Sequence, residues 1–413
     1  MQSKAHSYSS NLVMEFNLNQ TQSNLNTPQR ILVVAGEASG DEHAAELIAE
    51  LKKRHPEFEF FGMGGSKLKA AGLDQVVDAE KSAAVMGITE LWGGLTQVIS
   101  AFKRIQRAVR ERRPDLAILV DFPDFNLRLA KFLKREGVKI FYYVGPQVWA
   151  WRKSRVKTIR KRIDMLAVIL PFEEAFFSQH GIPTTYVGHP LVDHRVKISR
   201  DEFIRNNQLP LAANYIALLP GSRKSEVRNL LKVMLEAFDR LSTARPGLQA
   251  LIPVAAGLDY ASLEKLVRGH PHVSLVREQA RECLTYAEAA LVASGTATLQ
   301  AALCKTPCAV IYKLSNFSYF LARLLIRGVK HFSLVNLVAG RKLVTELLQD
   351  QVTPERLHLE LESILGNPEH AAKMRQGLDL VSQRLQGNPQ DGASTALRAA
   401  RLAEQVLFAK PSS

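Results

Sequence analysis

The sequence predicts an α/β protein built from two doubly wound parallel sheets that face each other across a cleft. Short apolar segments recur along the chain and alternate with segments of helical periodicity, which is typical of parallel sheets covered on both faces. The alternation loosens over residues 195–212 and then restarts, so the chain contains two such series. A chain of 413 residues is also long enough for two or three domains.

The elements follow in order along the chain. Residues 1–29 are rich in Asn, Gln, Ser and Thr and lack the apolar core of a signal peptide, so we expect a disordered polar leader. The predicted strands of the first domain, residues 30–200, are 31–35, 58–61, 116–120, 139–144, 165–170 and 184–187. Those of the second domain, residues 201–366, are 215–219, 249–254, 273–276, 290–293 and 308–312. The tail over 353–408 has helical periodicity, and its apolar face must pack on a domain.

The charge balance indicates anionic partners. Lys and Arg number 54 against 40 Asp and Glu, which gives a formal net charge of +14. Such a chain attracts nucleic acid, acidic lipid headgroups or phosphorylated small molecules. The hydrophobic share of 46% is that of a soluble globular protein, and no apolar run approaches the ~18 residues of a membrane span. Three cysteines do not form a disulfide framework, so we expect a reducing cytoplasm.

Polar residues follow the strands of the first series, at the sheet edge where such folds bind ligands. Residues 36–41 form a small-residue loop that lets a ligand approach the backbone, although an ordinary turn with Asp41 as N-cap explains this loop better when it is taken alone. Asp121 and Asp124 can supply a general base and its positioning partner. A turn around Pro123, with Asp124 capping the next helix, is equally favoured.

Aromatic and basic residues follow the strand at 139–144. Trp149 and Trp151 are two of the three tryptophans. Such side chains can stack on a sugar or receive an acyl chain, but a tryptophan pair that packs the loop is at least as frequent. Residues 152–162 then carry seven basic side chains and no acidic one, which modestly favours an anionic partner over a solvated helix face.

An apolar stripe at helical period runs through residues 88–105. Its members are Ile88, Leu91, Trp92, Leu95, Val98, Ile99, Phe102 and Ile105. A basic flank over 103–113 follows, with only Glu111 opposing it. The usual explanation of such a stripe is core packing, while the large aromatic residue and the basic flank also fit a helix that lies in a membrane surface.

Two loops of the second series have the composition of an anion-binding site. Residues 219–227 and 293–299 each close a strand and open a helix, so free backbone N–H groups point at a ligand. Arg223 adds a guanidinium that can bind two phosphate oxygens. Together the loops predict a diphosphate ligand such as a nucleotide sugar. Neither loop has P-loop spacing, no metal-binding Asp-x-Asp occurs, and a structural role is the simpler one for His189 and His194.

Seven short segments are distinctive in composition and order. They are 36–41 (GEASGD), 85–88 (VMGI), 121–126 (DFPDFN), 148–152 (VWAWR), 188–193 (GHPLVD), 219–223 (LPGSR) and 294–298 (SGTAT). Together they resemble the motifs of the lipid-A-disaccharide synthase family, bacterial inverting glycosyltransferases. The resemblance covers residues 31 to about 400. It implies a GT-B fold, in which two Rossmann-like domains face each other and the last helices, about 367–413, cross back to the first domain.

The resemblance also implies a reaction. UDP-2,3-diacylglucosamine would donate its sugar to the 6-hydroxyl of 2,3-diacylglucosamine 1-phosphate, which gives a β-1,6 disaccharide 1-phosphate and UDP. The family needs no metal or other cofactor and works at the cytoplasmic face of the inner membrane, among anionic lipids. We therefore expect a cytoplasmic protein, peripheral on that membrane, that takes acylated glucosamine substrates and binds no nucleic acid. The oligomeric state stays open, with a homodimer as one outcome.

Carried over residue by residue, the resemblance assigns roles. Asp121 matches the general base, and Arg223 matches the arginine that offsets the charge of the leaving UDP. The residues expected to bind UDP are Gly221, Ser222, Arg223, Ser294, Gly295, Thr296, Gln300, Asn336 and Arg341. Those expected in the acceptor cleft are Glu37, Ser39, Asp41, Asp124, Asn126, Trp149 and Arg152. Those expected to contact the membrane are Ile88, Leu91, Trp92, Leu95, Val98 and Ile99.

The chain departs from the family pattern at two positions. Gln300 stands where Glu is usual, so a ribose contact there uses a carbonyl without a charge, and Gly145 stands where Ser is usual. Two alternative functions stay open. Another GT-B protein, such as a UDP-sugar epimerase, would need no apolar stripe. A basic nucleic-acid-binding protein is less favoured, because no helix-turn-helix, RRM or zinc motif occurs.

Overall fold

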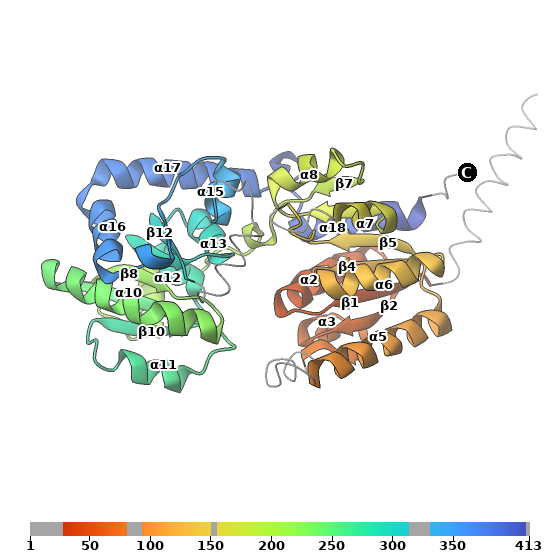
Figure 1. The fold of residues 1–413 in the computed structure, drawn as a ribbon, viewed down its shortest axis with the longest axis horizontal. Coiled ribbons are helices and arrows are strands. Elements are labelled where there is room, and N and C mark those ends of the chain that lie inside the picture. The colour runs from red at the N-terminus through yellow and green to blue at the C-terminus, as the bar shows by residue number, and fades with distance from the viewer. Residues whose placement is uncertain (1–27, 81–92, 150–154, 314–330, 410–413) are drawn as a thin grey trace, which may run out of the picture.

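The protein contains two parallel sheets in two adjacent layered domains (Figure 1). The computed structural model describes residues 28–80, 93–149, 155–313 and 331–409. The first sheet has seven strands in the order β3-β2-β1-β4-β5-β6-β7, and the second has six in the order β10-β9-β8-β11-β12-β13. In both sheets the strand order reverses at an inner pair, β1–β4 and β8–β11, which is the doubly wound arrangement. The predicted fold class is confirmed.

The first domain alternates strands and helices. Its strands are β1 (Arg30–Ala35), β2 (Glu59–Gly64), β3 (Asp74–Asp78), β4 (Leu116–Val120), β5 (Lys139–Tyr143), β6 (Met165–Val168) and β7 (Thr184–Tyr186). Its helices are α2 (Ala38–Arg54), α3 (Ser66–Ala70), α5 (Gly93–Arg112), α6 (Pro123–Arg135), α7 (Arg155–Arg162) and α8 (Pro171–Ser178). The 3₁₀ helix η1 (Pro190–Val192) and helix α9 (Arg200–Asn206) lead into the second domain.

The second domain repeats this plan. Its strands are β8 (Asn214–Leu219), β9 (Leu248–Val254), β10 (Val273–Arg277), β11 (Ala289–Ala293), β12 (Cys308–Tyr312) and β13 (Glu346–Leu348). Its helices are α10 (Lys224–Ala244), α11 (Tyr260–Val267), α12 (Ala280–Tyr286), α13 (Ala297–Leu303), α15 (Leu334–Ala339), α16 (Pro354–Gly366) and α17 (Pro368–Leu385), with α18 (Thr395–Phe408) last. Two further 3₁₀ turns are η2 (Gln349–Gln351) and η3 (Pro389–Asp391).

Every strand that the sequence predicts is present, and the described residues form two additional strands. The additional strands, β3 and β13, lie at outer edges of their sheets. An edge strand has a neighbour on one side only and needs few apolar residues, so Asp-Gln-Val-Val-Asp in β3 carries no apolar run that would identify it. The central strands are predictable because both of their faces are buried, and every residue of β4 is buried.

Alternate residues of β1 enter two separate cores, one on each face of the first sheet. Leu32 and Val34 belong to one core, and Ile31 and Val33 belong to the other. All four side chains are fully buried. This alternation follows from the two-residue period of a strand, and it explains why the sheet must be covered by helices on both faces.

The last helix returns to the first domain. Ala399, Ala403 and Leu407 of α18 are buried in a core of the first sheet, where α18 packs beside α2 (Figure 1). In contrast, Met374 and Leu378 of α17 are buried in the core of the second sheet. The predicted return of the C-terminal helices is therefore confirmed for α18, but its expected start near residue 367 is wrong. Both helices have an apolar face, and the sequence does not tell which sheet each face covers.

The chain thus passes between the domains twice, once after β7 and once after α17, and the two passages are in contact. The backbone N–H of His189 donates to the carbonyl of Leu385 at 2.8 Å. The guanidinium of Arg398 donates to the carbonyl of Val187 at 3.1 Å and to that of Gln386 at 2.9 Å. Arg398 therefore ties both passages together at one point.

The described part of the apolar stripe belongs mainly to the core. Ile105 is fully buried, and Val98 and Phe102 pack against the same core from α5. Among the described residues expected to contact the membrane, Ile99 is 46% exposed, whereas Val98 is partly buried against the core. The remaining four expected residues, Ile88, Leu91, Trp92 and the side chain of Leu95, lie outside the described residues. Among the helices that the structure describes, none has both the length and the apolar character needed to span a membrane.

Candidate active site

The carboxyl end of β4 holds Asp121 in an uncommon backbone conformation. Asp121 and Phe122 both have a φ of 47°, in the left-handed region that L-residues rarely adopt. The Asp121 N–H donates to the carbonyl of Tyr143 at 3.0 Å, and the Asp121 carbonyl accepts from Tyr142 Oη at 2.5 Å and from Asn126 Nδ2 at 2.8 Å. Strain that surrounding contacts maintain in this way is characteristic of functional positions.

The carboxyl group of Asp121 has the electrostatics of a general base. Burial, together with the neighbouring carboxylate of Glu37, raises the pKa of Asp121 to about 6, although the backbone N–H of Phe122 acts in the opposite direction. Above that pH the group is deprotonated and can accept a proton. A pKa close to the working pH suits a base, because the group is then both ionised and basic.

The residues that we expected in the acceptor cleft from the loop after β1 fall into two groups. Glu37 and Ser39 are exposed at the N-terminus of α2, where they are free to meet a ligand. Asp41 is only 4% exposed, and its carboxylate accepts backbone hydrogen bonds from Gly65 at 2.5 Å and Lys67 at 3.0 Å. The expectation that Asp41 contacts the acceptor is therefore wrong, because this side chain fixes the loop before α3.

Asp124 and Asn126 also serve the scaffold around Asp121. Asp124 forms an ion pair with Arg155 at the start of α7. Asn126 is fully buried, and its Nδ2 donates to the carbonyl of Val120 at 3.2 Å as well as to that of Asp121. Asn126 is therefore a positioning residue that holds the Asp121 turn, and its expected contact with the acceptor is wrong.

Trp149, which we expected in the acceptor cleft, packs against helix α8. Its Nε1 donates to Glu173 Oε1 at 2.9 Å, and its ring meets that of Phe172 edge-on with centroids 4.9 Å apart. The Glu173 carboxyl is completely buried, which raises its pKa to about 7. Trp151 and Arg152 lie outside the described residues.

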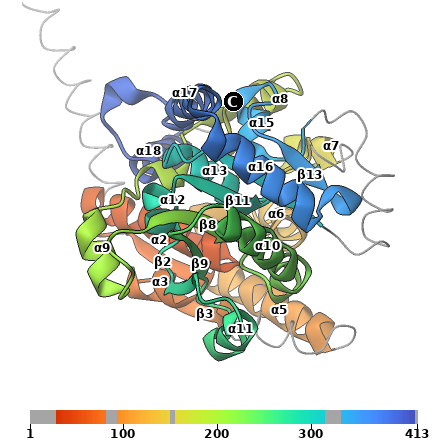
Figure 2. The same ribbon diagram turned by 90° about the vertical axis from the view of Figure 1, so that its left-hand side faces the viewer.

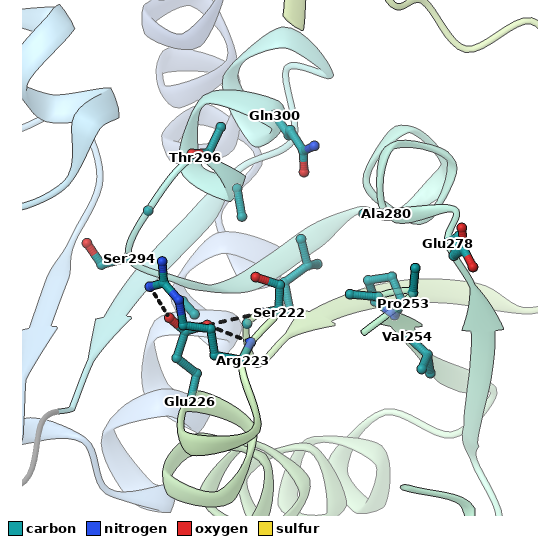
Figure 3. Close-up of a pocket in the computed structure, with 17 residues that line it drawn as sticks. Ser222, Arg223, Glu226, Pro253, Val254, Glu278, Ala280, Ser294, Thr296 and Gln300 are labelled. Atoms are coloured by element: carbon teal, nitrogen blue, oxygen red, sulfur yellow. Dashed lines mark hydrogen bonds and ion pairs between the residues drawn. The ribbon is translucent and has the colours of Figure 1, made fainter. Parts of the chain in front are cut away.

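A cavity of about 530 Å³ opens at the carboxyl ends of the second sheet's strands (Figure 3). Seven of the residues expected to bind UDP line it together: Gly221, Ser222, Arg223, Ser294, Gly295, Thr296 and Gln300. Six of them come from the loop before α10 and the loop before α13, and Gln300 comes from α13 itself. The two predicted anion-binding loops therefore form one site.

Within this cavity, Glu226 fills part of the anion-binding loop (Figure 3). Its Oε2 accepts from the backbone N–H groups of Ser222 at 3.0 Å and Arg223 at 3.2 Å, and its Oε1 lies 3.2 Å from the Arg223 guanidinium. The carboxylate fits because residue 221 is glycine, where a Cβ would lie 2.2 Å from Glu226 Oε2. Three donors thus converge on one internal anion, as they would on a phosphate oxygen.

The cavity contains residues that the sequence analysis did not identify. Glu278 lines it at the end of β10, and Pro253–Ala256 lines it at the end of β9. Both follow the carboxyl ends of predicted strands, which is the signal that could have found them. Glu278 supplies a carboxylate in the cavity that also contains the neutral Gln300.

Two residues expected to bind UDP do not line the cavity. Asn336 is fully buried, and its Nδ2 donates to Val344 O and Glu346 Oε1, both at 2.9 Å. Its Oδ1 accepts from the N–H groups of Leu343 at 2.8 Å and Val344 at 3.0 Å. The amide has no exposed surface for a nucleotide, so the expected contact is wrong and Asn336 holds its own loop. Arg341 is exposed and lies outside the cavity lining.

One group of side chains among the described residues has ligand atoms close enough for a metal ion. The atoms of Glu42, Glu46 and His194 all lie within 4.8 Å of one another. His194 Nε2 already pairs with Glu46 at 2.9 Å, and Lys67 pairs with Glu42 at 2.9 Å. The group is therefore an ion-pair network. His189 is 4% exposed, and burial lowers its pKa to about 3, which suits a neutral structural histidine.

Two Rossmann-like domains, one with a strained aspartate at a strand end and the other with an anion-binding cavity, place the protein in the GT-B class of glycosyltransferases and epimerases. Similar solved structures are the glycotransferase of kitacinnamycin (TM-score 0.61, 16% identity, 92% of this chain and 99% of that one) and the UDP-GlcNAc 2-epimerase of Neisseria meningitidis (TM-score 0.59, 11% identity, 86% and 98%). The lipid-A-disaccharide synthetase family matches residues 31–399, and the chain belongs to that family.

Curated relatives agree with this assignment. The lipid-A-disaccharide synthase of Myxococcus xanthus is 44% identical over 389 residues, which are 94% of this chain and 99% of that protein. That of Syntrophus aciditrophicus is 44% identical over 358 residues, which are 86% and 93%. The predicted family is confirmed, and with it an enzyme of the glycosyltransferase class in lipid A biosynthesis. Neither the epimerase nor the nucleic-acid-binding alternative is favoured.

Proposed function

We propose that this protein transfers the sugar of UDP-2,3-diacylglucosamine to the 6-hydroxyl of 2,3-diacylglucosamine 1-phosphate, with inversion at the anomeric carbon. The observation that carries the proposal is that the two domains supply different chemical groups. Asp121, with its pKa of about 6, supplies a base in the first domain. The loop around Arg223 supplies converging donors for a diphosphate in the second.

The reaction follows from these two groups. Asp121 accepts the proton of the acceptor hydroxyl as that oxygen attacks the anomeric carbon. The bond from this carbon to the β-phosphate oxygen breaks on the opposite side, so the electron pair leaves with UDP. The Arg223 guanidinium and the N–H of Ser222 then stabilise the charge that develops on the diphosphate. Such fixed donors stabilise a charge without reorganisation, so we expect them to carry this role without a divalent cation.

The rest of the cavity suits a nucleotide. Gly295 has a φ of 147° and no atom within 4 Å of the place where a Cβ would lie, so the loop leaves room for a ligand beside it. Gln300 presents a carbonyl and an amide, and Glu278 presents a carboxylate. Either group can accept from the ribose hydroxyls, which offsets the absence of the glutamate that the family usually has at position 300.

We also propose that the protein works at the cytoplasmic face of the inner membrane, bound peripherally through anionic lipids. Helix α7 supports this proposal. Val156 and Ile159 face the core, whereas Lys157, Arg160 and Lys161 are exposed. Basic side chains near an anionic surface each contribute about 1 kcal/mol to binding, and salt screens this attraction. Sedimentation with phosphatidylglycerol vesicles, weakened by added salt and absent with phosphatidylcholine vesicles, is the expected result.

The direct test supplies both acylated glucosamine substrates to the purified protein in detergent. Mass spectrometry detects the disaccharide 1-phosphate, and a coupled assay measures the released UDP. Reactions that lack one substrate serve as controls, and UDP-GlcNAc alone tests for epimerisation. A folded protein that binds UDP and yet forms no disaccharide would contradict the proposed reaction.

A further inference from the structure

A second cavity, of about 700 Å³, lies between α10 and α11 and is not explained by the reaction described above. Its walls include buried aliphatic side chains from both helices, among them Val227, Leu231, Leu235 and Leu263. Pockets of about 300–1,000 Å³ with apolar walls are the usual size and character of small-molecule sites. A cavity of this volume with aliphatic walls has room for an apolar group of a ligand.

The second cavity adjoins the candidate UDP cavity along two stretches of chain. Arg223 lines the first cavity, and the next residue, Lys224, lines the second. Ala256 lines the first, and Leu258 lines the second. A ligand whose diphosphate is bound at Arg223 therefore has the apolar cavity directly beside it.

The outer end of the second cavity is open. Leu266 of α11 lines it and is 57% exposed. Figures 1 and 2 both show α11 along the same side of the molecule as α5, the helix that carries the exposed Ile99. Lys224 and Lys232 stand among the cavity's lining residues, and their aliphatic stems can cover an alkyl chain while the ammonium groups stay in water.

We propose that this cavity binds an acyl chain of the donor substrate while the UDP group occupies the adjoining cavity. The proposal rests on the proposed function, because only an acylated nucleotide sugar needs a polar and an apolar site side by side. A membrane surface is the competing occupant. The position of this cavity next to the UDP cavity along two stretches of the chain favours the acyl chain, since a membrane contact would need no proximity to that site.

The test measures binding of UDP-N-acylglucosamines whose acyl chains have two to ten carbons, by calorimetry and without detergent. In the wild-type protein, affinity should rise with chain length by up to about fourfold per methylene, the limit set by about 0.8 kcal/mol for each buried CH₂. Ser262 is an exposed residue of α11 that lines the cavity. Ser262→Trp should fill its mouth, remove the rise and weaken the ten-carbon ligand at least tenfold, with UDP affinity unchanged.

Glu264→Trp is the matched control. Glu264 lies on the same helix, two residues from Ser262, and is exposed outside the cavity lining. This variant should keep the dependence on chain length. Leu266→Asp places a charge at the open end without filling it and should reduce the rise in affinity, so the proposal stays testable if Ser262→Trp does not fold.

Each other outcome has a defined meaning. Wild-type affinity that is independent of chain length, or equal losses in the two tryptophan variants, would overturn the proposal. So would a Ser262→Trp protein that keeps the chain-length dependence but no longer sediments with phosphatidylglycerol vesicles, because the cavity would then serve the membrane. If the protein bound no UDP, both the UDP cavity and the acyl cavity would be contradicted as donor sites. Chain-dependent binding without disaccharide formation would contradict the proposed reaction and support the acyl cavity.

Discussion

Glu226 binds the backbone N–H of Arg223 with one carboxylate oxygen, at 3.2 Å, and pairs with the Arg223 guanidinium through the other, at 3.2 Å. A side chain of the protein thus occupies the donors that we assign to the diphosphate of the donor. Binding of UDP must either displace this carboxylate or share its donors. We therefore expect Glu226 to lower the affinity of the cavity for anions.

Glu226→Gln should tighten UDP binding about threefold to tenfold. The amide has no charge to repel the diphosphate and is a weaker competitor for the same N–H groups. Because Glu226 also caps the first turn of α10, the free energy of unfolding of the variant should fall by roughly 1 kcal/mol. Calorimetric titration with UDP measures the effect. Weaker binding would mean that Glu226 orients Arg223 for the ligand instead of competing with it.

Arg223→Lys should lower kcat about a hundredfold with little change in thermal stability. A lysine keeps the charge but cannot form the two parallel bonds that a guanidinium offers a phosphate. The side chain of Arg223 is 77% exposed, so the loss of its guanidinium removes no core packing. Steady-state kinetics at saturating substrate give the comparison, with Arg375→Lys as the matched control, because Arg375 is exposed on α17 and lines neither cavity. Equal losses in the two variants would argue against a specific role for Arg223.

Asp121→Asn should reduce turnover by at least about 10²-fold, the usual contribution of a general base, while UDP binding survives. For the wild type, kcat/KM should fall as the pH drops through about 6, because the base becomes protonated there. Substantial residual activity, or an unchanged pH profile, would exclude Asp121 as the base.

The same substitution should stabilise the fold above pH 6. Because the native pKa of Asp121 is about 6 against an ordinary value of 3.8, the ionised side chain costs the native state up to about 3 kcal/mol once the pH exceeds both values. That penalty is absent below pH 4. Thermal melts of wild type and Asp121→Asn at pH 4 and pH 8 should therefore diverge only at the higher pH.

Glu173→Gln should remove part of the pH dependence of stability. The pKa of Glu173 is raised by burial to about 7, so the native state loses stability as the pH rises from about 4.5 through 7. Glutamine can still accept from Trp149 Nε1, but it faces the N–H of Leu170 with a donor group, so stability near pH 5 should fall by about 1–3 kcal/mol. Tryptophan fluorescence during urea unfolding, repeated across pH, checks both effects.

The fold is predictable from the sequence wherever a strand is buried on both faces, because such a strand has a continuous apolar sequence. Strand β4 is buried along its whole length and is easily identified, whereas β3 at the sheet edge begins and ends with aspartate. The small residues of the loops before α10 and α13 predict the anion-binding cavity, because only such residues let donors converge on a ligand.

The hydrogen-bond partners of individual polar side chains could not be predicted in the same way. Asp41 accepts hydrogen bonds from a loop 24 residues further along the chain. The side chains of Asn126 and Asn336 form hydrogen bonds with backbone groups of neighbouring turns. A sequence motif shows that a polar group is required but not which way it points. Glu278 joins the cavity only through the order of strands β10, β9 and β8.

The pair of connections tied by Arg398 has a mechanical consequence. A domain attached by one segment can swing and also twist about that segment. Two segments held against each other by several hydrogen bonds resist twisting, because each would have to wind around the other, but they still permit swinging. Gly188 and Gly387 meet where these segments are in contact, each with a positive φ. We therefore expect the two domains to move relative to each other about one fixed axis, which would return Asp121 and the loop around Arg223 to the same alignment in every catalytic cycle.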